Sequence, residues 1–316
     1  MINKDKSNHQ GSEKQVKTIS CEQFANQFGM KIIHEGRGEL TVDSISVNRP
    51  GLQFAGYLDH FANERVQLIG NAEINFLACL PEKIKKRAID QFFAQEIPCL
   101  IVARGLTIDD EIIEGAKKYD CPLFSSEKVT TSLISEITNY LSEVLAPTAV
   151  IHGVMMDILG VGMLITGNAG IGKSETALEL IERGNCLVAD DSVIVTSLRG
   201  KLSATCPEKI RYFMEVRGVG IINVKSMFGP GAVRLNKKID LIAELTPWNE
   251  DSEYDRLGDE KLTENILGVQ VQKLVIPVSP GRNIPIILET AARKFRLEEF
   301  GYNAVDELIK GAFSGK

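Results

Sequence analysis

The stretch of sequence that decides the fold of the carboxyl-terminal half is Met163-Leu164-Ile165-Thr166-Gly167-Asn168-Ala169-Gly170-Ile171-Gly172-Lys173-Ser174. Its last eight residues match the pattern G-x-x-x-x-G-K-[ST] in full, which is typical of a phosphate-binding loop between a strand and a helix. Glycines let the backbone curl so that successive N–H groups converge on phosphate oxygens, and the helix that follows adds its positive end. The stretch therefore predicts an α/β domain with a phosphate site.

The residues on either side of the loop favour this interpretation. Strand-like Met163 to Thr166 precedes the loop, and the helical stretch Glu175 to Arg183, closed by Gly184, follows it. The alternative, a glycine turn without a ligand, is less favoured because of these flanks. Lys173 is expected to reach the β- and γ-phosphates, and the hydroxyl of Ser174 is expected to ligate Mg²⁺. The predicted ATP-binding residues are Gly167, Asn168, Ala169, Gly170, Ile171, Gly172, Lys173 and Ser174.

Two carboxylates follow the loop at a suggestive distance. The apolar run Cys186 to Ala189 ends in Asp190 and Asp191, and the first of these lies sixteen residues after Ser174. This pattern resembles a Walker B element. Consecutive residues of a strand point to opposite faces, so only one of the two carboxylates is expected to face the phosphates. The pattern alone does not decide which one, and a solvated acidic strand end is the alternative.

The residues before the loop are rich in strand-forming types. Thr148 to Ile158 and Gly162 to Thr166 are separated by Leu159-Gly160-Val161, which predicts a hairpin. His152 lies on the first of these strands, the one expected to pair beside the loop. A lone histidine is usually a satisfied or surface residue, and the pattern alone gives His152 no catalytic role.

The amino-terminal half shows a different, regular pattern. Ser20 and Gln23 have capping-box spacing and predict a helix ending near Gly29, followed by a strand-like stretch from Gly38 to Val47. Apolar runs then alternate with helical segments, which predicts a doubly wound parallel sheet. The apolar runs are Ile74 to Leu80, Cys99 to Ala103 and Pro122 to Phe124, and the helical segments are Glu82 to Gln95, Ile108 to Tyr119 and Lys128 to Leu145.

A proline marks the expected domain boundary. A helix usually stops before proline, and Leu145-Ala146-Pro147 interrupts the last helical segment of the amino-terminal half. The predicted organisation is a disordered tail over residues 1–16, an amino-terminal αβ domain over 17–146 and a phosphate-loop domain over 147–316. Both domains belong to the α/β class.

Composition and charge exclude several classes of protein. The chain has 316 residues, 44% of them hydrophobic and 25% charged, which is typical of a soluble globular protein. Its net charge of -6 provides no basic field for nucleic acid or an anionic membrane. The six cysteines form no C-x-x-C pair, and the first fifteen residues are polar, so free thiols in a cytoplasmic protein are expected.

A glycine-rich stretch after the second carboxylate is weak by itself. Met214 to Val224 reads as an apolar strand interrupted by glycines, and a bulged strand would look similar. Together with the other motifs, however, it resembles the HPr kinase/phosphorylase family of bacteria. The motifs GNAGIGKSETALEL, VADD, EVRGVGIINV, Tyr254-Asp255-Arg256-Leu257-Gly258 and Pro277-Val278-Ser279-Pro280-Gly281-Arg282 occur in the family's order. EVRGVGIINV, with Glu215, Arg217, Gly218, Gly220 and Asn223, is the most specific of them.

The resemblance implies a bifunctional enzyme of carbon catabolite repression. It implies phosphorylation of a serine in the phosphocarrier protein HPr by ATP, with pyrophosphate as a second possible donor. It also implies phosphorolysis of phosphoserine-HPr by inorganic phosphate to give pyrophosphate. Mg²⁺ is the implied cofactor and HPr the implied partner, with no nucleic acid and no membrane. A nucleotide core similar to that of phosphoenolpyruvate carboxykinase and assembly as a homohexamer are implied as well.

The resemblance also implies roles for single residues. His152 matches the active-site histidine beside the catalytic carboxylate, and Asp191 matches the residue that takes a proton from the serine and returns it in the reverse reaction. Glu215 is implied to hold Mg²⁺ together with Ser174, and Arg256 to face the transferring phosphoryl group. The stretch implied to serve the dephosphorylating reaction is Pro277, Val278, Ser279, Pro280, Gly281 and Arg282.

Some features stay open. The family loop more often has acidic or hydroxyl residues where this chain has Asn168 and Ala169, a change expected to matter little because the loop works through backbone N–H groups. The helical end, Glu289 to Phe313, with Arg293, Lys294 and Arg296, fits a subunit contact, substrate docking or a solvated helix equally well. The rival functions are a small-molecule kinase on the same core and a nucleotide-gated binding protein without transferase activity.

Overall fold

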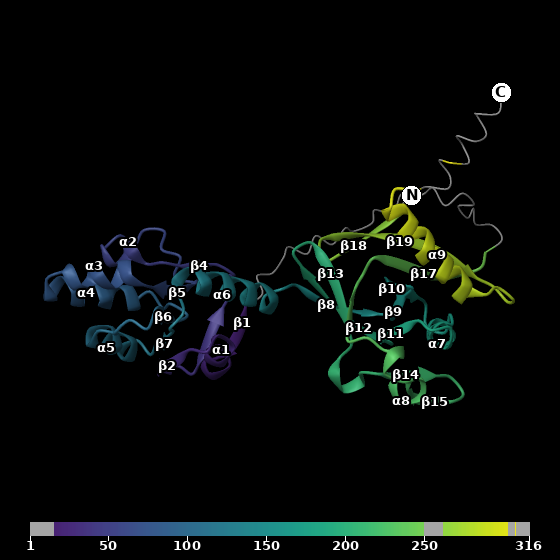
Figure 1. Ribbon diagram of the computed structural model, residues 1–316, viewed down its shortest axis with the longest axis horizontal. Coiled ribbons are helices and arrows are strands. Elements are labelled where there is room, and N and C mark those ends of the chain that lie inside the picture. Colours follow the sequence, from purple (N-terminus) through teal and green to yellow (C-terminus); the bar gives the residue numbers. More distant parts are fainter. Residues whose placement is uncertain (1–15, 250–261, 303–306, 308–316) are drawn as a thin grey trace, which may run out of the picture. The chain divides into compact units, whose positions relative to one another are not determined.

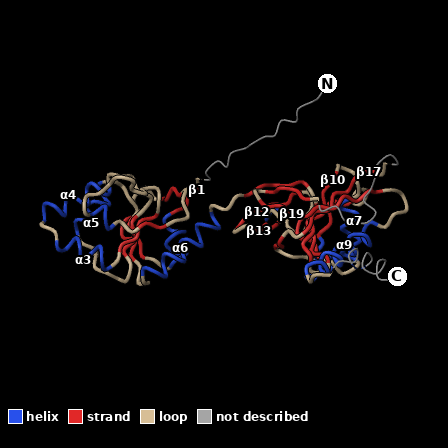
Figure 2. Tube along the Cα trace, turned by 90° about the horizontal axis from the view of Figure 1, so that it is seen from above, coloured by secondary structure: helices blue, strands red, loops and turns tan. Residues whose placement is uncertain are grey.

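The chain forms two compact units that meet in the sequence between Ala146 and Pro147. A computed structural model describes residues 16–249, 262–302 and 307, and its elements are labelled in Figure 1. Figure 2 shows that each unit contains both helices and strands. Within the described residues, no helix combines the length and the apolar character needed to cross a bilayer. The six cysteines are free thiols, five of them buried and Cys79 exposed.

The first unit is built on a five-stranded sheet with the order β2-β7-β6-β5-β4. Strands β4 to β7 are parallel, and β2 pairs with β7 in the antiparallel sense. The strands are β2 (Lys31–His34), β4 (Val47–Asn48), β5 (Val66–Ile69), β6 (Leu100–Val102) and β7 (Leu123–Ser125). A separate antiparallel pair joins β1 (Lys17–Ser20) to β3 (Glu39–Val42). The predicted parallel pairing is thus confirmed for four of the five strands of this sheet, and β2 is the antiparallel exception.

Helices cover both faces of this sheet because its strands are apolar on both sides. One face packs against α1 (Cys21–Phe28) and α6 (Thr130–Val144), and the other against the four remaining helices. These are α2 (Gly51–Phe54), α3 (Asn71–Cys79), α4 (Glu82–Phe93) and α5 (Asp110–Lys118). Helix α1 begins as its capping residues predict, since the Ser20 hydroxyl accepts a hydrogen bond from the Gln23 N–H at 3.1 Å.

The sequence-based assignment was wrong in two places in this unit. The apolar run Ile74 to Leu80, expected as a strand, lies in helix α3. The reason is visible in its burial, since Glu73 and Leu77, four residues apart, face the interior as helical spacing requires. The strand is the preceding Val66–Ile69. The stretch from Gly38 to Val47 is not one strand but parts of β3 and β4, which pair with different partners.

The second unit is built on a six-stranded sheet with the order β11-β9-β10-β17-β19-β18. The three strands β10, β17 and β19 are parallel, and the others are antiparallel to their neighbours. The strands are β9 (Val154–Ile158), β10 (Val161–Gly167), β11 (Cys186–Ala189), β17 (Leu241–Pro247), β18 (Thr263–Ile266) and β19 (Val269–Val278). Mixed α/β structure in both units confirms the predicted fold class at that level.

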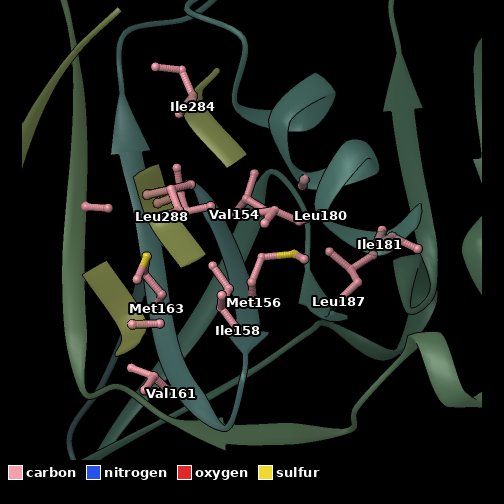
Figure 3. Close-up of a cluster of buried hydrophobic side chains, with 14 of the residues drawn as sticks. Val154, Met156, Ile158, Val161, Met163, Leu180, Ile181, Leu187, Ile284 and Leu288 are labelled. Carbon is pink, nitrogen blue, oxygen red and sulfur yellow. The ribbon is translucent and has the colours of Figure 1, made fainter. Parts of the chain in front are cut away.

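Alternation along the strands gives this sheet two buried faces. Figure 3 shows Val154, Met156 and Ile158 of β9 in the cluster that packs against α7 (Lys173–Glu182) and α9 (Ile284–Glu299). The intervening Met155 joins the cluster on the opposite face, which packs against a four-stranded antiparallel sheet of order β16-β13-β12-β8. Its strands are β8 (Thr148–His152), β12 (Ser192–Leu198), β13 (Lys201–Thr205) and β16 (Asn236–Lys238). The phosphate-loop strand β10 is therefore held from both sides.

Smaller elements complete the second unit. A hairpin of β14 (Phe213–Val216) and β15 (Gly220–Asn223) precedes helix α8 (Val224–Phe228). Short helical turns η1 (Glu208–Ile210) and η2 (Pro230–Ala232) flank this segment. The stretch Met214 to Val224 is therefore a hairpin followed by a helix, and the expectation of one strand interrupted by glycines was wrong.

Thr148 to Ile158 is not a continuous strand either. It breaks at Gly153 into β8, which pairs with β12, and β9, which forms the predicted hairpin with β10. Only glycine fits at the break, because a Cβ on Gly153 would lie 2.6 Å from the Ile165 carbonyl oxygen. His152 consequently ends β8 opposite Ser192, and it does not lie on the strand beside the phosphate loop.

Candidate active site

The phosphate loop connects the end of β10 to the start of α7, as its sequence predicts. Gly167, Gly170 and Gly172 all have positive φ angles of 137°, 82° and 98°, which favour glycine over any side chain. At Gly167 a Cβ would also lie 2.5 Å from the Leu245 carbonyl oxygen of the neighbouring strand. These glycines therefore shape a backbone concavity at the amino end of α7, where N–H groups lack helical partners.

Lys173 occupies the concavity with its own amino group. Its Nζ donates hydrogen bonds to the carbonyl oxygens of Gly167 at 2.8 Å and Asn168 at 3.2 Å. The side chain is 8% exposed, so its charge is held close to the loop. Asn168 contacts Lys173 through its backbone carbonyl oxygen. An anion bound in the loop would meet this ammonium group directly.

A cleft of about 340 Å³ opens beside the loop. Five elements contribute to its wall: the phosphate loop with the first turn of α7, the segment after β11, the end of β8, the short turn η1 and the β14–β15 hairpin. The lining residues are His152, Ala169, Gly170, Gly172, Lys173, Ser174, Glu175, Asp190, Asp191, Ile210, Phe213, Met214, Glu215, Arg217 and Ile221. Residues far apart in the sequence thus meet at one site.

Asp190 lies at the base of the cleft and is 5% exposed. The Ser174 hydroxyl donates to its Oδ1 at 3.1 Å, and the Glu215 backbone N–H donates to its Oδ2 at 3.3 Å. Burial raises the pKa of the Asp190 carboxyl, an effect opposed by these two hydrogen bonds and reinforced by the negative charge of Asp191. A carboxylate placed against the loop serine is the arrangement expected of a Walker B element.

Asp191 lines the same cleft, although neighbouring residues of a strand should diverge. Its φ angle of +65° shows the reason, because this left-handed conformation ends the extended geometry on which the alternation rule depends. The expectation that only one of the two carboxylates faces the site was therefore wrong. Asp191 is 73% exposed, and its Oδ1 lies 2.9 Å from Nδ1 of His152. The histidine and carboxylate pair through two segments that the sequence could not place together.

The β14–β15 hairpin brings two further charged residues to the cleft. Met214 and Val216 of β14 are buried, whereas Glu215 between them and Arg217, the first residue of the following turn, are exposed and line the cleft. Gly218 and Gly220 have φ angles of +84° and +101°, which permit the tight turn. Asn223 has a structural contact: its side-chain oxygen accepts a hydrogen bond from the Ser226 N–H at 2.9 Å and caps α8.

The stretch implied to serve dephosphorylation lies at the same edge of the sheet but outside the lining of the cleft. Pro277 and Val278 end β19, and the stretch continues to Arg282 just before α9. Because β17 separates β19 from β10, the two loops are about two strand spacings apart, roughly 10 Å. Arg282 donates to the Pro277 carbonyl oxygen at 3.0 Å, and its Cζ lies 5.9 Å from the centre of the Trp248 ring.

Two other sequence-based expectations concern Arg256 and the carboxyl-terminal helix. Arg256 and the rest of Tyr254 to Gly258 lie outside the described residues. The carboxyl-terminal helix α9 spans Ile284–Glu299, so it begins five residues before the expected start. Most of the expected stretch after Tyr302, up to Phe313, lies outside the described residues. Glu289 is 7% exposed and accepts a hydrogen bond from Arg183 at 3.0 Å. This position is therefore not solvated, and it ties α9 to the end of α7.

The donor chemistry of the cleft fits Mg²⁺. The side chains of Ser174 and Asp190 offer hard oxygen atoms that already lie 3.1 Å apart, and the Glu215 carboxylate lines the same cleft. The described residues contain no group of three or more His, Cys, Asp and Glu side chains arranged around a common point. Mg²⁺ typically takes one or two carboxylates and completes its shell with phosphate oxygens and water, which matches this sparse set.

Sequence reasoning missed Asp190 as a metal-ligand candidate and gave Arg217 no role. A signal for Asp190 was present, because it is the first carboxylate after the apolar strand and Ser174 lies sixteen residues before it. For Arg217 the signal was its place in the EVRGVGIINV motif, which does not indicate a chemical role. The contact of Arg217 with the loop depends on a hairpin whose position is fixed only by the tertiary fold.

Comparisons with known proteins cover both units. Residues 19–141 match the family model described as HPr Serine kinase N terminus, and residues 143–312 match HPr Serine kinase C-terminal domain. The HPr kinase/phosphorylase of Caldanaerobacter subterraneus subsp. tengcongensis is 47% identical over 93% of this chain and 97% of its own length. That of Alkaliphilus metalliredigens is 45% identical over 92% and 95%, respectively. The solved Hpr(Ser) kinase/phosphatase of Coxiella burnetii matches 51% of this chain and 98% of its own, with 36% identity and a TM-score of 0.47.

Proposed function

Because the chain belongs to the HPr serine kinase family, we propose that it transfers a phosphoryl group from ATP to a serine of HPr and also removes that group by phosphorolysis. The observation that carries this proposal is a single cleft that joins the phosphate loop, the Ser174–Asp190 contact and the His152–Asp191 pair. Together these groups provide what phosphoryl transfer needs: a phosphate cradle, metal ligands and a base.

The phosphate loop and Lys173 bind the donor phosphates. Backbone N–H groups of the loop would contact the phosphate oxygens, and the Lys173 ammonium would exchange its two carbonyl contacts for the β- and γ-phosphates. Ser174 and Asp190, with Glu215 beside them, would hold Mg²⁺. When bound, the ion withdraws negative charge from the phosphate oxygens. These residues orient the donor so that its terminal phosphorus faces the opening of the cleft.

Asp191 is the proposed base at the opening. The serine hydroxyl of HPr forms a bond to the terminal phosphorus, the bond from that phosphorus to the β-phosphate oxygen breaks, and ADP leaves. The hydroxyl proton passes to Asp191. His152, whose Nδ1 lies 2.9 Å from the Asp191 carboxylate, holds that carboxylate in one orientation. The high exposure of Asp191 suits a base that must meet a serine carried by another protein.

Phosphorolysis uses the same groups in reverse. An oxygen of inorganic phosphate forms a bond to the phosphorus of phosphoserine, the bond to the serine oxygen breaks, and Asp191 returns a proton to that oxygen. The products are pyrophosphate and serine-HPr. We place Arg282, from the stretch at residues 277–282, in the role of a further cation for this anion-rich reaction. Arg256 is proposed to face the transferring phosphoryl group, as its family match implies.

Several finer features belong to the same proposal. These are dependence on Mg²⁺, a nucleotide core similar to that of phosphoenolpyruvate carboxykinase, assembly as a homohexamer and a role in carbon catabolite repression. Exposed apolar side chains on and after α9, such as Leu297 at 49% and Phe300 at 82%, support a subunit contact there. Sedimentation equilibrium of the purified chain tests the hexamer.

A transfer assay tests the central proposal. Purified protein is incubated with HPr, Mg²⁺ and ATP labelled in the γ-phosphate, and phosphoserine is then identified in HPr. An HPr variant without the target serine is the substrate control, and omission of Mg²⁺ tests the cofactor. Subsequent addition of phosphate should release labelled pyrophosphate. Nucleotide binding without any phosphoserine would instead favour the nucleotide-gated binding protein.

A further inference from the structure

The position of Arg217 stands out among the residues of the cleft. A Cβ built on Gly170 would lie 3.1 Å from Nη1 of Arg217 and 3.7 Å from its Cζ. The guanidinium group therefore lies against the middle of the phosphate loop, in space that a side chain at residue 170 would take. Gly170 has a φ angle of +82°, which a glycine adopts without strain. The loop is thus shaped to let this arginine approach its backbone.

The hairpin holds Arg217 in this position through its strand. The Glu215 N–H donates to Asp190 at 3.3 Å, which ties β14 to the carboxylate that also contacts Ser174. Buried Met214 and Val216 anchor the other side of the strand in the core. Arg217 follows directly after these contacts and before the Gly218 turn. Arg217 is the first residue of the turn after β14, and a charged side chain next to an anchored strand is better positioned than one on a free loop.

The charges of the cleft leave Arg217 available to an anion. Among the lining residues that the structure describes, Lys173 and Arg217 are the only lysine and arginine. Lys173 donates to two loop carbonyl oxygens, whereas Arg217 makes no hydrogen bond or ion pair within residues 16–249, 262–302 and 307. It stays unpaired although carboxylates line the same cleft, at Glu175, Asp190, Asp191 and Glu215.

We propose that Arg217 is a catalytic residue that binds oxygens of the transferring phosphoryl group beside Gly170 of the phosphate loop. This inference rests on the proposed function. The planar guanidinium fork matches two phosphate oxygens, and its charge stabilises the negative charge carried by the group during transfer. Because phosphorylation and phosphorolysis move the same group through the same place, Arg217 serves both directions.

Kinetic measurements on three variants test the role. Arg217→Ala is expected to lower kcat on the order of 10³-fold in both directions, and Arg217→Lys to lose less because it keeps the charge but not the fork. Lys225→Ala is the matched control, since Lys225 lies on the adjacent helix α8, over the Tyr212 ring, and does not line the cleft. It should stay within about twofold of the parent protein. An Arg217→Ala variant with near-normal kcat would overturn the proposal.

A binding measurement separates this inference from the proposed function. Titration with a non-hydrolysable ATP analogue and with ADP should show about tenfold weaker binding of the analogue to Arg217→Ala and little change for ADP, because only the analogue has the terminal phosphate. Equal weakening for both nucleotides would overturn the proposal, as would a change confined to the KM for HPr. If the parent protein fails to phosphorylate HPr, the proposed function fails, whereas the two titrations still decide the role of Arg217.

Discussion

Both units contain a helix whose amino end follows a buried parallel strand, but they satisfy the N–H groups of that end in different ways. In each, a buried parallel strand leads through a glycine into the amino end of a helix, where backbone N–H groups lack partners. In the first unit, the N–H of Gly70 donates to Glu73 at 2.9 Å, and Arg49 pairs with the same carboxylate at 2.8 Å. A side chain of the protein thus takes the place of an anion.

The second unit leaves the equivalent position open. Among the described residues, helix α7 begins after Gly172 without a side-chain cap, and its first residue, Lys173, donates hydrogen bonds to two loop carbonyl oxygens. The carboxylates of this unit, Asp190 and Asp191, line the cleft, and neither caps the helix. The comparison teaches that topology alone does not make a phosphate site. What matters is whether the protein satisfies the helix end with its own groups or reserves it for a ligand.

The largest expected effect comes from a substitution in the phosphate loop at the uncapped end of α7, called the open site below. Lys173→Ala removes the buried cation of the loop, so phosphorylation and phosphorolysis should both fall at least about 10³-fold, since both place phosphate in the same cradle. The two assays with HPr and phosphoserine-HPr measure it. Arg49→Ala, which removes the cation at the closed helix end of the first unit, is the control and should leave both rates within about twofold. Comparable losses in the two variants would contradict the distinction drawn between the units.

The next effect separates the two carboxylates of the open site. Asp191→Asn removes the base and should lower kcat about 10²–10⁴-fold with little change in nucleotide affinity. Asp190→Asn should instead weaken binding of the Mg²⁺-nucleotide far more than binding of free nucleotide, because Asp190 contacts Ser174, the other proposed metal ligand. Titrations with and without Mg²⁺, run beside the kinetics, measure both. If Asp190→Asn mainly lowered kcat and Asp191→Asn mainly weakened Mg²⁺-nucleotide binding, Asp190 would be the base and Asp191 the metal ligand.

A smaller effect concerns the neighbouring loop at the same sheet edge. Arg282→Ala should reduce phosphorolysis about tenfold more than phosphorylation, because only phosphorolysis brings a diffusible phosphate beside a second anion. The ratio of the two rates on one preparation measures it. Arg282 now donates to Pro277, so phosphate would have to compete for this guanidinium. An unchanged ratio would assign the residue to loop structure alone.

Local patterns in the sequence predicted much of the fold. The phosphate loop, its flanking strand and helix, the β9–β10 hairpin and the capped helix at Ser20 all depend on residues close in the sequence. The missed features depend on distant contacts or on a single backbone angle. Gly153 redirects the chain because Ile165 lies beside it, and Asp191 enters the cleft because its φ angle is +65°. Neither condition leaves a periodic signal.

The candidate site shows the same division between local and distant information. Lys173 and Ser174 follow from one motif, whereas the pairing of His152 with Asp191 joins β8 to the segment after β11. The family resemblance supplied that pairing and no local pattern did. The motifs marked Arg217 and Asp190 without giving either a chemical role, because those roles depend on which groups the two residues touch across the cleft.

The smallest expected effect concerns stability and compares one carboxylate from each unit. Glu73 is buried, paired with Arg49 and bonded to Gly70, so Glu73→Gln should lower the free energy of unfolding of the first unit by about 1–3 kcal/mol. Asp190 differs because burial and the nearby Asp191 charge raise its pKa in the folded chain above the ordinary value of 3.8. Ionisation of Asp190 therefore lowers the free energy of unfolding. This loss is absent below the ordinary pKa, where Asp190 is protonated in both the folded and the unfolded chain. The loss of stability grows as the pH rises from the ordinary pKa through the raised pKa of the folded chain.

Asp190→Asn should accordingly raise or preserve the melting temperature of the second unit at neutral pH without Mg²⁺, while the gain vanishes near pH 3. Calorimetry of both variants across this range, with the parent protein alongside, measures the difference. A loss of stability in Asp190→Asn as large as that in Glu73→Gln would show that Asp190 is a structural carboxylate like its counterpart. If Glu73→Gln lowers stability while Asp190→Asn raises it, the Asp190 carboxylate destabilises the folded chain. Such a cost is expected of a group that is retained because it binds a ligand.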